Sequence, residues 1–420
     1  MISLGIDFGT SGARAAVVNE AGNILAEAKY AFSGKKLAVT PTEWQTALFS
    51  LLEQLPLELR QKTEAIAIDG TSSTVLLCDA MGNPIVTPLL YHDDRGIAVM
   101  EQLRAIAPPH HTVIGATSSL AKLLWWQKAC RDAQLCAPPT ETYFLHQADW
   151  LGFLLHGQLG VSDYHNALKL GYDVENLCYP DWLLELPSLP ILPQVLIPGT
   201  PVGKVMAEVR SQFGLPQDCL VRAGTTDSIA AFLGSGANSP GEAVTSLGST
   251  LVLKLLSQTR VEDARYGIYS HRLGDLWLTG GASNTGGAVL RHFFTDEELE
   301  SLSRQIDPSY ESPLDYYPLL KAGDRFPIND AQLAPQLEPR PENPVEFLHG
   351  LLESTARIEA QGYQLLQQLG ATPLQCVYTA GGGAKNAVWT QIRARHLGIP
   401  VVQSGHTEAA YGTALLAQSC

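Results

Sequence analysis

The sequence is poor in charge and poorest in basic residues: 17% of its 420 residues are charged, with 28 Lys and Arg against 42 Asp and Glu. A net charge of −14 repels nucleic acid and anionic membrane surfaces. No apolar run approaches the ~18 residues that a membrane-spanning helix needs. We therefore predict neither a nucleic-acid nor a membrane partner. Any anion that binds must be held locally, by backbone N–H groups or a metal ion.

Cysteine is also scarce, and its spacing forms no known framework. The seven cysteines are odd in number and never spaced C-x-x-C, which disfavours both a disulfide scaffold and a zinc site. The N-terminus has no basic segment and already contains the carboxylate of Asp7, so a secretory signal is not expected. We expect a cytoplasmic protein with reduced thiols. The cysteines are Cys78, Cys130, Cys136, Cys178, Cys219, Cys376 and Cys420.

Length and composition favour a compact globular protein. With 45% hydrophobic residues and 37 glycines, the chain is neither disordered nor fibrous. At ~150 residues per domain, two or three domains are expected. The stretch 234–241, rich in Gly, Ser and Pro, is the best candidate for a boundary. We predict two domains, residues 1–238 and 239–420.

Apolar periodicity and capping residues predict mixed α/β structure. A helix begins at Pro41 with Thr40 as its N-cap, and another runs from Pro344 to about Leu369 with Asn343 as its N-cap. The N-terminal segment predicts a three-stranded meander. Its strands are Ile2–Phe8, Ala13–Val18 and Ile24–Tyr30. Further predicted elements are the strands Ala65–Asp69, Leu220–Ala223, Leu276–Leu278 and Cys376–Tyr378, and the helices Leu120–Cys130 and Thr226–Leu233.

One internal similarity links the two predicted domains. Residues 4–11 (LGIDFGTS) and residues 243–250 (AVTSLGST) each combine an apolar strand, a glycine and two hydroxyl residues, and a second β run follows each. A duplicated strand-turn-strand predicts two domains of like fold that face one another.

The two turns could bind phosphate. Glycine followed by Ser or Thr in a tight turn lets N–H groups and hydroxyls converge on one anion, although each turn alone is also compatible with an ordinary hairpin. Asp7 lies two residues before Gly9, at the end of a strand that is otherwise apolar. An ionised carboxylate is costly there unless it binds a cation, so Asp7 is a candidate for holding Mg²⁺ through water.

Three further segments carry possible chemistry. Residues 379–386 follow a strand and open a helix, which favours an anion site, but they match neither the Rossmann nor the P-loop pattern. Residues 280–287 form a similar Gly-rich segment after Leu278. Asp227, in Gly-Thr-Thr-Asp at a strand-to-helix junction, is either a helix N-cap or a base that takes a proton from an attacking alcohol.

In combination, these motifs resemble the FGGY carbohydrate kinases, members of the sugar kinase, Hsp70 and actin superfamily. The likeness runs from Ile2 to about Leu416. It rests on six segments in the family's order. They are Gly5–Ser11 and 245–250 (phosphate motifs), 379–386 (adenosine motif), 224–227 (catalytic segment), 92–95 (sugar loop) and 283–287 (nucleotide side).

The resemblance implies two RNase H-like α/β domains around a central nucleotide cleft, with ATP and Mg²⁺ as cofactors. Asp227 would be the general base and Asp7 would organise the metal, both next to the sugar. For Arg95, a surface ion pair with Asp93 or Asp94 is the alternative. The remaining implied contacts are Thr10, Ser11, Gly248, Ser249 and Thr250 with the phosphates; Gly382, Gly383, Asn386 and Trp389 with the nucleoside; and Ser72, Ser73, Asp93 and Arg95 with the sugar.

Departures from the family pattern bear on the substrate. The chain is shorter than most members, with reductions at 32–40 and after Phe294, and it resembles a compact cyanobacterial and plant branch. Residues 70–74 (GTSST) replace the Gly-Gln-Met-His-Gly of xylulose kinases, and the Arg-Glu pair of glycerol kinases is missing.

We therefore expect phosphorylation of a ketopentose at its terminal primary hydroxyl, D-ribulose to D-ribulose 5-phosphate. The protein would act as a monomer or homodimer. D-xylulose is the alternative substrate. The rival functions are an actin- or Hsp70-like nucleotide switch and a degenerate kinase kept for binding.

Overall fold

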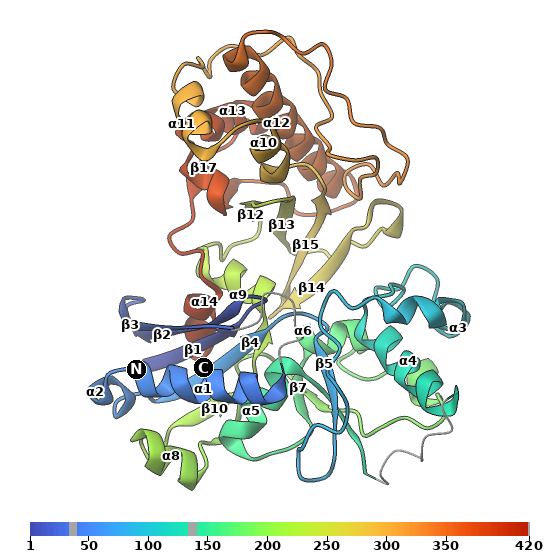
Figure 1. Cartoon of the computed structure of the whole chain (residues 1–420), viewed down its shortest axis with the longest axis vertical. Helices are drawn as coiled ribbons and strands as arrows, with labels where there is room; N and C mark the ends of the chain where they lie inside the picture. The colour runs from blue at the N-terminus through green and yellow to red at the C-terminus, as the bar shows by residue number, and fades with distance from the viewer. Residues whose placement is uncertain (33–39, 133–140, 419–420) are drawn as a thin grey trace. The chain divides into compact units, whose positions relative to one another are not determined.

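Two mixed β-sheets organise the chain, one in each of two units of the computed structural model (Figure 1). The structure describes residues 1–32, 40–132 and 141–418. Most of the shortened segment 32–40, as well as Cys136 and Cys420, therefore lies outside the described residues. Unit 1 comprises Met1–Gly234 and Glu408–Cys420, and unit 2 comprises Ser235–Thr407. The predicted second domain contains residues 408–420, whereas the structure returns them to unit 1.

The sheet of unit 1 has the order β3-β2-β1-β4-β10-β9, and β11 pairs with β4 beyond β10. β1 is antiparallel to β2 and parallel to β4, so the carboxyl ends of β1 and β4 meet at one edge. The strands are β1 (Ile2–Phe8), β2 (Gly12–Asn19), β3 (Ile24–Ala31), β4 (Ala65–Gly70), β9 (Pro201–Lys204), β10 (Leu220–Arg222) and β11 (Thr225–Thr226).

The sheet of unit 2 repeats this arrangement, with the order β14-β15-β13-β12-β16-β17. β12 occupies the place of β1: it is antiparallel to β13, as β1 is to β2, and parallel to β16, as β1 is to β4. The predicted duplication of an α/β fold is confirmed. The strands are β12 (Glu242–Leu247), β13 (Leu251–Ser257), β14 (Tyr269–Leu273), β15 (Leu276–Ser283), β16 (Cys376–Ala380) and β17 (Val401–Gln403).

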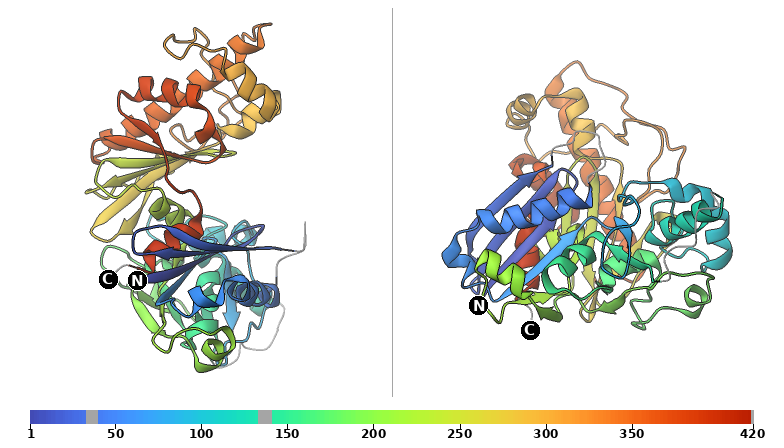
Figure 2. Two further views of the ribbon diagram at one scale, coloured as in Figure 1. Left: turned by 90° about the vertical axis from the view of Figure 1, so that its left-hand side faces the viewer. Right: turned by 60° about the horizontal axis from the view of Figure 1, so that its bottom comes forward.

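Helices cover both faces of the first sheet. α1 (Pro41–Gln54) and α5 (Gln147–His156) lie on one face, and α9 (Asp227–Gly234) with α14 (Ala409–Leu416) lie on the other (Figure 2). Glycine permits the close approach of α14. A Cβ at Gly5 would lie 2.1 Å from the Ala410 carbonyl oxygen, and a Cβ at Gly412 would lie 1.8 Å from that of Ala230. α2 (Leu57–Arg60) and α8 (Ala207–Phe213) complete this part.

A second apolar cluster in unit 1 supports its loops. Val75, Leu89, Leu103, Leu123 and Phe144 are among its buried members. It lies among two short strands and the helices near α4, separate from the core beneath the main sheet. The elements are β5 (Val75–Cys78), β6 (Tyr143–His146), η1 (Arg95–Val99), α3 (Met100–Ile106), α4 (Ser119–Asp132), β7 (Val161–Asp163), α6 (Tyr164–Ala167), η2 (Leu168–Leu170), α7 (Asp181–Leu184) and β8 (Gln194–Leu196).

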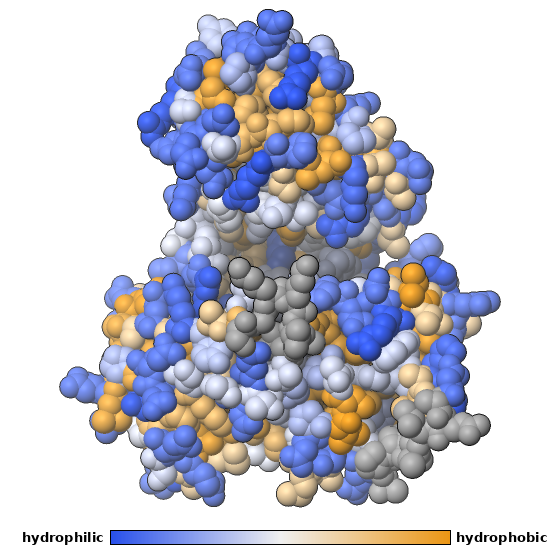
Figure 3. All heavy atoms as spheres, viewed as in Figure 1, coloured by the Kyte–Doolittle hydropathy of each residue, from blue (hydrophilic) through white to orange (hydrophobic). Residues whose placement is uncertain are grey.

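Unit 2 buries its core between the sheet and the 25-residue helix α12 (Pro344–Gln368). Figure 3 shows hydrophilic side chains over most of the visible surface, with apolar ones in small groups. In the described part of the chain, no helix combines the length and apolar character needed to span a bilayer. The other helices are η3 (Ala264–Tyr266), α10 (Gly287–Phe293), α11 (Asp296–Ser303), η4 (Gly382–Lys385) and α13 (Ala387–Leu397).

Local sequence rules explain the helix ends. The Thr40 side chain accepts from the Glu43 N–H at the start of α1, and Asn343 accepts from Val345 at the start of α12, as predicted. The Gly-rich segment 280–287 begins within a strand, because β15 extends to Ser283 and so continues beyond the predicted strand end at Leu278. A Cβ at Gly280 would lie 1.9 Å from the Leu253 carbonyl oxygen, so this glycine serves strand packing.

Candidate functional site

Three carboxylates come together at the carboxyl edge of the first sheet. Asp7 near the end of β1 is the register partner of Asp69 on β4. Asp69 is also the partner of Thr225 on β11, and Asp227 follows two residues later as the first residue of α9. Parallel pairing therefore places Asp7, Asp69 and Asp227 at one edge, where loops carry functional groups in α/β folds.

Burial makes these carboxylates unusual acids. It raises the pKa of Asp7 to about 6; the charge of Asp227 acts in the same direction, while a hydrogen bond with Asp69 and the charge of Arg14 oppose it. Asp69 is fully buried, and burial with the nearby charge of Asp7 raises its pKa well above the ordinary value. Burial therefore makes Asp69 a weaker acid than an ordinary aspartate. Its Oδ2 accepts a hydrogen bond from Thr413 of α14.

The Asp7 carboxylate suits a hydrated cation better than a chelated one. Among the described residues, no three Asp, Glu, His or Cys side chains are arranged to hold a metal. Arg14, the register partner of Asp7 on β2, is the cation that lowers the pKa of Asp7, and it also pairs with Glu408. The negative charge of Asp7 is thus only partly offset by Arg14. A half-buried carboxylate of this kind fits a water-mediated Mg²⁺, which keeps most of its waters.

The turn after β1 presents the predicted phosphate ligands. The Gly9 N–H donates to the Gly12 carbonyl at 3.0 Å, which closes the turn. Thr10 and Ser11 between them are exposed. Their hydroxyls lie next along the chain from Asp7, as the prediction requires.

A buried polar network fixes the segment that carries Asp227. The Thr225 hydroxyl lies 2.7 Å from His165 Nδ1, and the Thr225 carbonyl accepts from Asn166 Nδ2 at 3.1 Å. Asn166 in turn donates to Asp163 at 2.6 Å. Asp227 accepts a hydrogen bond from the Ser228 N–H at 2.6 Å and is the first residue of α9. Its position at the start of a helix therefore agrees with the structural role that was the alternative to a catalytic one.

The predicted sugar residues lie on two loops. Ser72 and Ser73 follow β4; Ser73 has φ of 64°, and its buried hydroxyl has no hydrogen-bond partner. Asp93 precedes η1, whose first residue is Arg95, and the two side chains form a two-pronged ion pair with contacts of 2.6–3.0 Å. The Arg95 guanidinium lies 4.6 Å from the ring centroid of Trp125 on α4. The predicted alternative for Arg95, a pair with Asp93, is therefore present.

Unit 2 contains a pocket of about 580 Å³. It brings together Gly248, Gly382, Gly383, Asn386 and Trp389, all predicted to contact nucleotide. Ser249 and Thr250 are not in its lining, although they lie in the same turn as Gly248. The lining that sequence reasoning missed comprises Leu247, Gly287, Leu290, Arg291, Asp296, Leu299, Glu300, Ser303, Arg304, Lys385, Ala387 and Val388.

Helix caps shape this pocket. Asn386 Oδ1 accepts from the Trp389 N–H at 3.0 Å as the N-cap of α13, and its Nδ2 donates to the Ser303 hydroxyl at 2.8 Å. The Trp389 ring is buried, and a Cβ at Gly383 would lie 2.7 Å from it. The Gly287 N–H donates to the Gly248 carbonyl at 2.9 Å, which ties the β12–β13 turn to α10. The result is an apolar wall beside backbone amides, the composition of a nucleoside site.

Most of the segment 283–287, which was expected on the nucleotide side, contacts other parts of unit 2 instead of the pocket. The Ser283 hydroxyl and the Asn284 N–H both donate to Asp324, each at 2.7 Å, and the Asn284 amide donates to the Gly323 carbonyl. These side chains organise the connection after α11. Only Gly287 of the segment lines the pocket.

Asp69 and Lys122 were not singled out from the sequence, although each has a recognisable sequence feature. Asp69 ends a buried strand as Asp7 does, and the argument made for Asp7 applies to it equally. Lys122 is the one lysine in the apolar stretch from Leu120 to Trp126, and it is fully buried. A lysine at a core position of a helix is uncommon enough to be noted.

The repeated strand order is that of the fold found in actin, Hsp70 and sugar kinases. The model described as the N-terminal domain of the FGGY family of carbohydrate kinases matches residues 2–234, and the C-terminal model matches residues 243–419. The chain belongs to the FGGY family of carbohydrate kinases, ATP-dependent enzymes, which confirms the predicted family.

Relatives cover nearly the whole chain at low identity. A xylulose kinase of Staphylococcus epidermidis is 23% identical and covers 99% of this chain and 87% of the relative. A xylulose kinase of Escherichia coli is 25% identical, with 99% and 89% covered. A crystal structure described as a xyloylose kinase from Brucella ovis has a TM-score of 0.86 at 24% identity, covering 100% of this chain and 90% of that one; this likeness shows the fold.

Proposed function

We propose that this carbohydrate kinase transfers the γ-phosphoryl group of ATP to the terminal primary hydroxyl of a ketopentose, with D-ribulose preferred and D-xylulose as the alternative. The observation that carries the proposal is the group of carboxylates Asp7, Asp69 and Asp227 at one edge of the first sheet. A sugar kinase needs a base for the attacking hydroxyl and a charge that holds a cation near the phosphates. This edge offers both.

Asp227 is assigned as the general base. It accepts the proton of the sugar hydroxyl as that oxygen attacks phosphorus, and the bond to the ADP oxygen breaks. The hydrogen bonds of Thr225 to His165 and Asn166 hold the segment that precedes Asp227. A carboxylate fixed in this way keeps its orientation during proton transfer.

Asp7 is assigned to Mg²⁺ through water, with Thr10 and Ser11 beside the phosphates. When bound, Mg²⁺ neutralises charge on the transferring phosphoryl group. Asp7 contributes a carboxylate whose ionised form is unfavourable without a cation, because burial raises its pKa to about 6. A hydrogen bond between the Asp69 and Asp7 side chains helps to fix the orientation of Asp7.

The nucleoside is assigned to the pocket of unit 2. Trp389, Leu290 and Leu299 supply apolar surface, and Gly382 and Gly383 present backbone without a side chain. The β12–β13 turn, with Gly248, Ser249 and Thr250, is assigned to phosphate oxygens. Its tie to α10 keeps the turn in place before nucleotide arrives.

The substrate assignment rests on small hydroxyl side chains. The two relatives described above are xylulose kinases. In this chain Ser72 and Ser73 stand where a resemblance to xylulose kinases leads us to expect Met and His, which favours a different pentulose. The unpaired buried hydroxyl of Ser73 and the Asp93–Arg95 pair are hydrogen-bonding groups suited to sugar hydroxyls.

A coupled assay of ADP release on a panel of D-ribulose, D-xylulose, L-ribulose and glycerol tests the function, with the product's phosphate position determined by NMR. We expect the highest kcat/KM with D-ribulose and phosphate at the terminal carbon. Sugar-independent ADP release would favour a nucleotide switch, and no turnover would favour a binding protein. EDTA should abolish turnover and excess Mg²⁺ should restore it.

A further inference from the structure

Lys122 of α4 is a buried cation that binds two loops at once. It is fully buried, and its ammonium donates to the Ser73 carbonyl at 2.7 Å and to the Leu90 carbonyl at 2.6 Å. Ser73 belongs to the loop after β4, and Leu90 precedes the Asp93–Arg95 loop. One side chain therefore ties together both loops that carry the predicted sugar residues.

The charges around Lys122 come from the same region. Burial lowers the pKa of Lys122 to about 7; the charge of Asp93 opposes this, and Lys169 and Arg95 add to it. Among the described residues, the ammonium forms no ion pair with a carboxylate. A fully buried lysine bonded only to carbonyls is an expensive way to fill a core, because its charge has lost most of its hydration.

The helix that carries Lys122 is itself firmly anchored. The Ser119 hydroxyl at its start lies 3.2 Å from His146 Nε2, and His146 Nδ1 lies 3.0 Å from Asp149. This order matches that of a hydrolytic triad, but Ser119 is fully buried and offers no nucleophile to a substrate. The hydrogen bonds among Ser119, His146 and Asp149 hold the start of α4 in place. One turn beyond Lys122, Trp125 supports the Arg95 guanidinium.

The loop that Lys122 holds is in an unusual conformation. Ser73 is a non-glycine residue at φ of 64°, and the Thr71 and Thr74 hydroxyls, 2.6 Å apart, brace the turn. The Ser73 hydroxyl is left buried without a partner. A strained turn with an unpaired hydroxyl persists only where its surroundings fix it, and such turns gather at ligand sites.

We propose that Lys122 is a positioning residue for the sugar: through the Ser73 and Leu90 carbonyls it sets the distance between the two sugar loops, and Trp125 supports Arg95 on the same helix. This rests on the proposed function. Lys122 does not touch the reacting atoms. It determines whether Ser72, Ser73 and the Asp93–Arg95 pair can contact one pentulose together.

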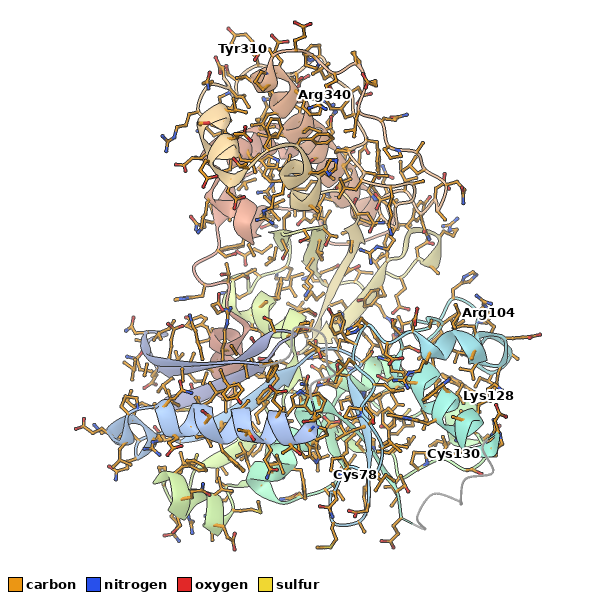
Figure 4. The ribbon with its side chains drawn as sticks, in the orientation of Figure 1. Cys78, Arg104, Lys128, Cys130, Tyr310 and Arg340 are labelled. Carbon is orange, nitrogen blue, oxygen red and sulfur yellow. The ribbon has the colours of Figure 1, made fainter. Side chains whose placement is uncertain are left out.

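The test is Lys122→Met, which keeps a long unbranched side chain and removes both hydrogen bonds. Loss of two charge-assisted hydrogen bonds should raise the KM for D-ribulose at least about tenfold. The KM for ATP should stay within about twofold of wild type, because the nucleoside pocket belongs to unit 2. The matched control is Lys128→Met on the exposed side of α4 (Figure 4), whose ion pair with Asp132 is worth little. It should leave both constants unchanged.

A second variant separates positioning from bulk stability. Lys122→Arg keeps the charge and several donors, and should recover part of the affinity for sugar. An unchanged sugar KM in Lys122→Met, or equal losses for sugar and ATP, would overturn the proposal. Failure of both variants to fold would make the residue purely structural and overturn it too. The wild-type sugar panel decides the proposed function separately: if wild type binds a pentulose, measured as protection against thermal unfolding, but does not phosphorylate it, only the kinase assignment fails.

Discussion

The two sheets share the arrangement of strands next to β1 and β12, but they differ in what the corresponding positions carry. Asp7 pairs with Asp69 between β1 and β4, and Ser246 pairs with Ala380 between β12 and β16. Each pair lies at the carboxyl edge of its sheet, just before a glycine-hydroxyl turn. The edge of unit 1 is thus acidic, whereas that of unit 2 is uncharged and leaves binding to backbone amides and the pocket beside them.

Buried acids show the same division. In unit 1, burial raises the pKa of Asp7 to about 6 and that of Asp163 to about 7. In unit 2, Glu359 forms a two-pronged ion pair with Arg393 at 2.6 and 2.7 Å. Burial acts to raise the pKa of Glu353, but hydrogen bonds with His349, His396 and Arg395 hold it well below its usual range.

This contrast separates two uses of the fold. Unit 2 compensates its buried charges internally, so they serve its own stability. Unit 1 leaves carboxylates undercompensated at the edge where catalysis is proposed, so they are available to a proton or a cation. This contrast can be tested with substitutions in each of the two units.

Asp227→Ala should have the largest effect. Removing a general base typically lowers kcat by about 10²–10⁴-fold, and nucleotide affinity should persist because the pocket of unit 2 is untouched. The measurements are kcat in the coupled assay and ADP affinity by calorimetry. Asp218→Ala is the control, since Asp218 is exposed and pairs only with Lys204. Retention of more than about a tenth of the activity would contradict the role of a base.

Glu359→Gln should destabilise unit 2 strongly. It leaves Arg393 buried without its counter-charge, and breaking a buried pair in this way costs about 3–5 kcal/mol. Chemical denaturation gives the free energy of unfolding. Glu262→Gln, which removes an ion pair with half-exposed partners, should cost less than about 1 kcal/mol. Equal effects of the two variants would show that the buried Glu359–Arg393 pair contributes no more to stability than the half-exposed pair of Glu262.

Glu353→Gln should destabilise in a pH-dependent way, by about 1.5–3 kcal/mol at pH 7. The folded pKa of Glu353 lies below its ordinary value of 4.5, so its stabilisation is fully present above pH 4.5 and is lost as the pH falls further. The gap in Tm between wild type and variant should therefore narrow on acidification below pH 4.5. A gap that widens there would show that the cluster is not held by charge.

Asp7→Asn should have the smallest effect on stability and the opposite sign. The folded pKa of about 6 exceeds the ordinary 3.8, so wild type loses stability as the pH rises from 3.8 through 6. The variant cannot ionise, and the rise in pKa corresponds to at most about 3 kcal/mol. Because Asp7 is only partly buried, solvent screening reduces this, and the variant should gain about 1–2 kcal/mol over wild type at pH 7 in EDTA and nothing at pH 3.5. Its kinase activity should nevertheless fall. Asp79→Asn serves as control: Asp79 is exposed and hydrogen-bonded to Asn83, which lowers its pKa, so no gain is expected.

Local signals in the sequence were sufficient for the framework. The caps at Thr40 and Asn343, the two glycine turns and Asp7 could be predicted because each depends on neighbours within a few residues. Contacts between side chains far apart in the sequence could not be predicted in this way. Arg393 reaches Glu359 across 34 residues, and Lys122 reaches Ser73 across 49, and no local pattern indicates either contact.

The residues that line the pocket of unit 2 also differ in how far they could be predicted. The glycines that line the pocket of unit 2 could be singled out from the sequence, because a run of glycines after a strand is a recognisable signal. Leu290, Leu299 and Ser303 come from α10 and α11, whose sequences resemble any amphipathic helix. Their role depends on where these helices pack.

The return of α14 to unit 1 affects how the protein is made. The helix that covers Gly5 and bonds to Asp69 lies about 400 residues after β1, so at ~5–20 residues per second it is translated tens of seconds after β1. For tens of seconds the nascent N-terminal sheet has a bare apolar face and a buried acid without its Thr413 partner. Unit 1 can therefore be completed only after the whole of unit 2 has been synthesised.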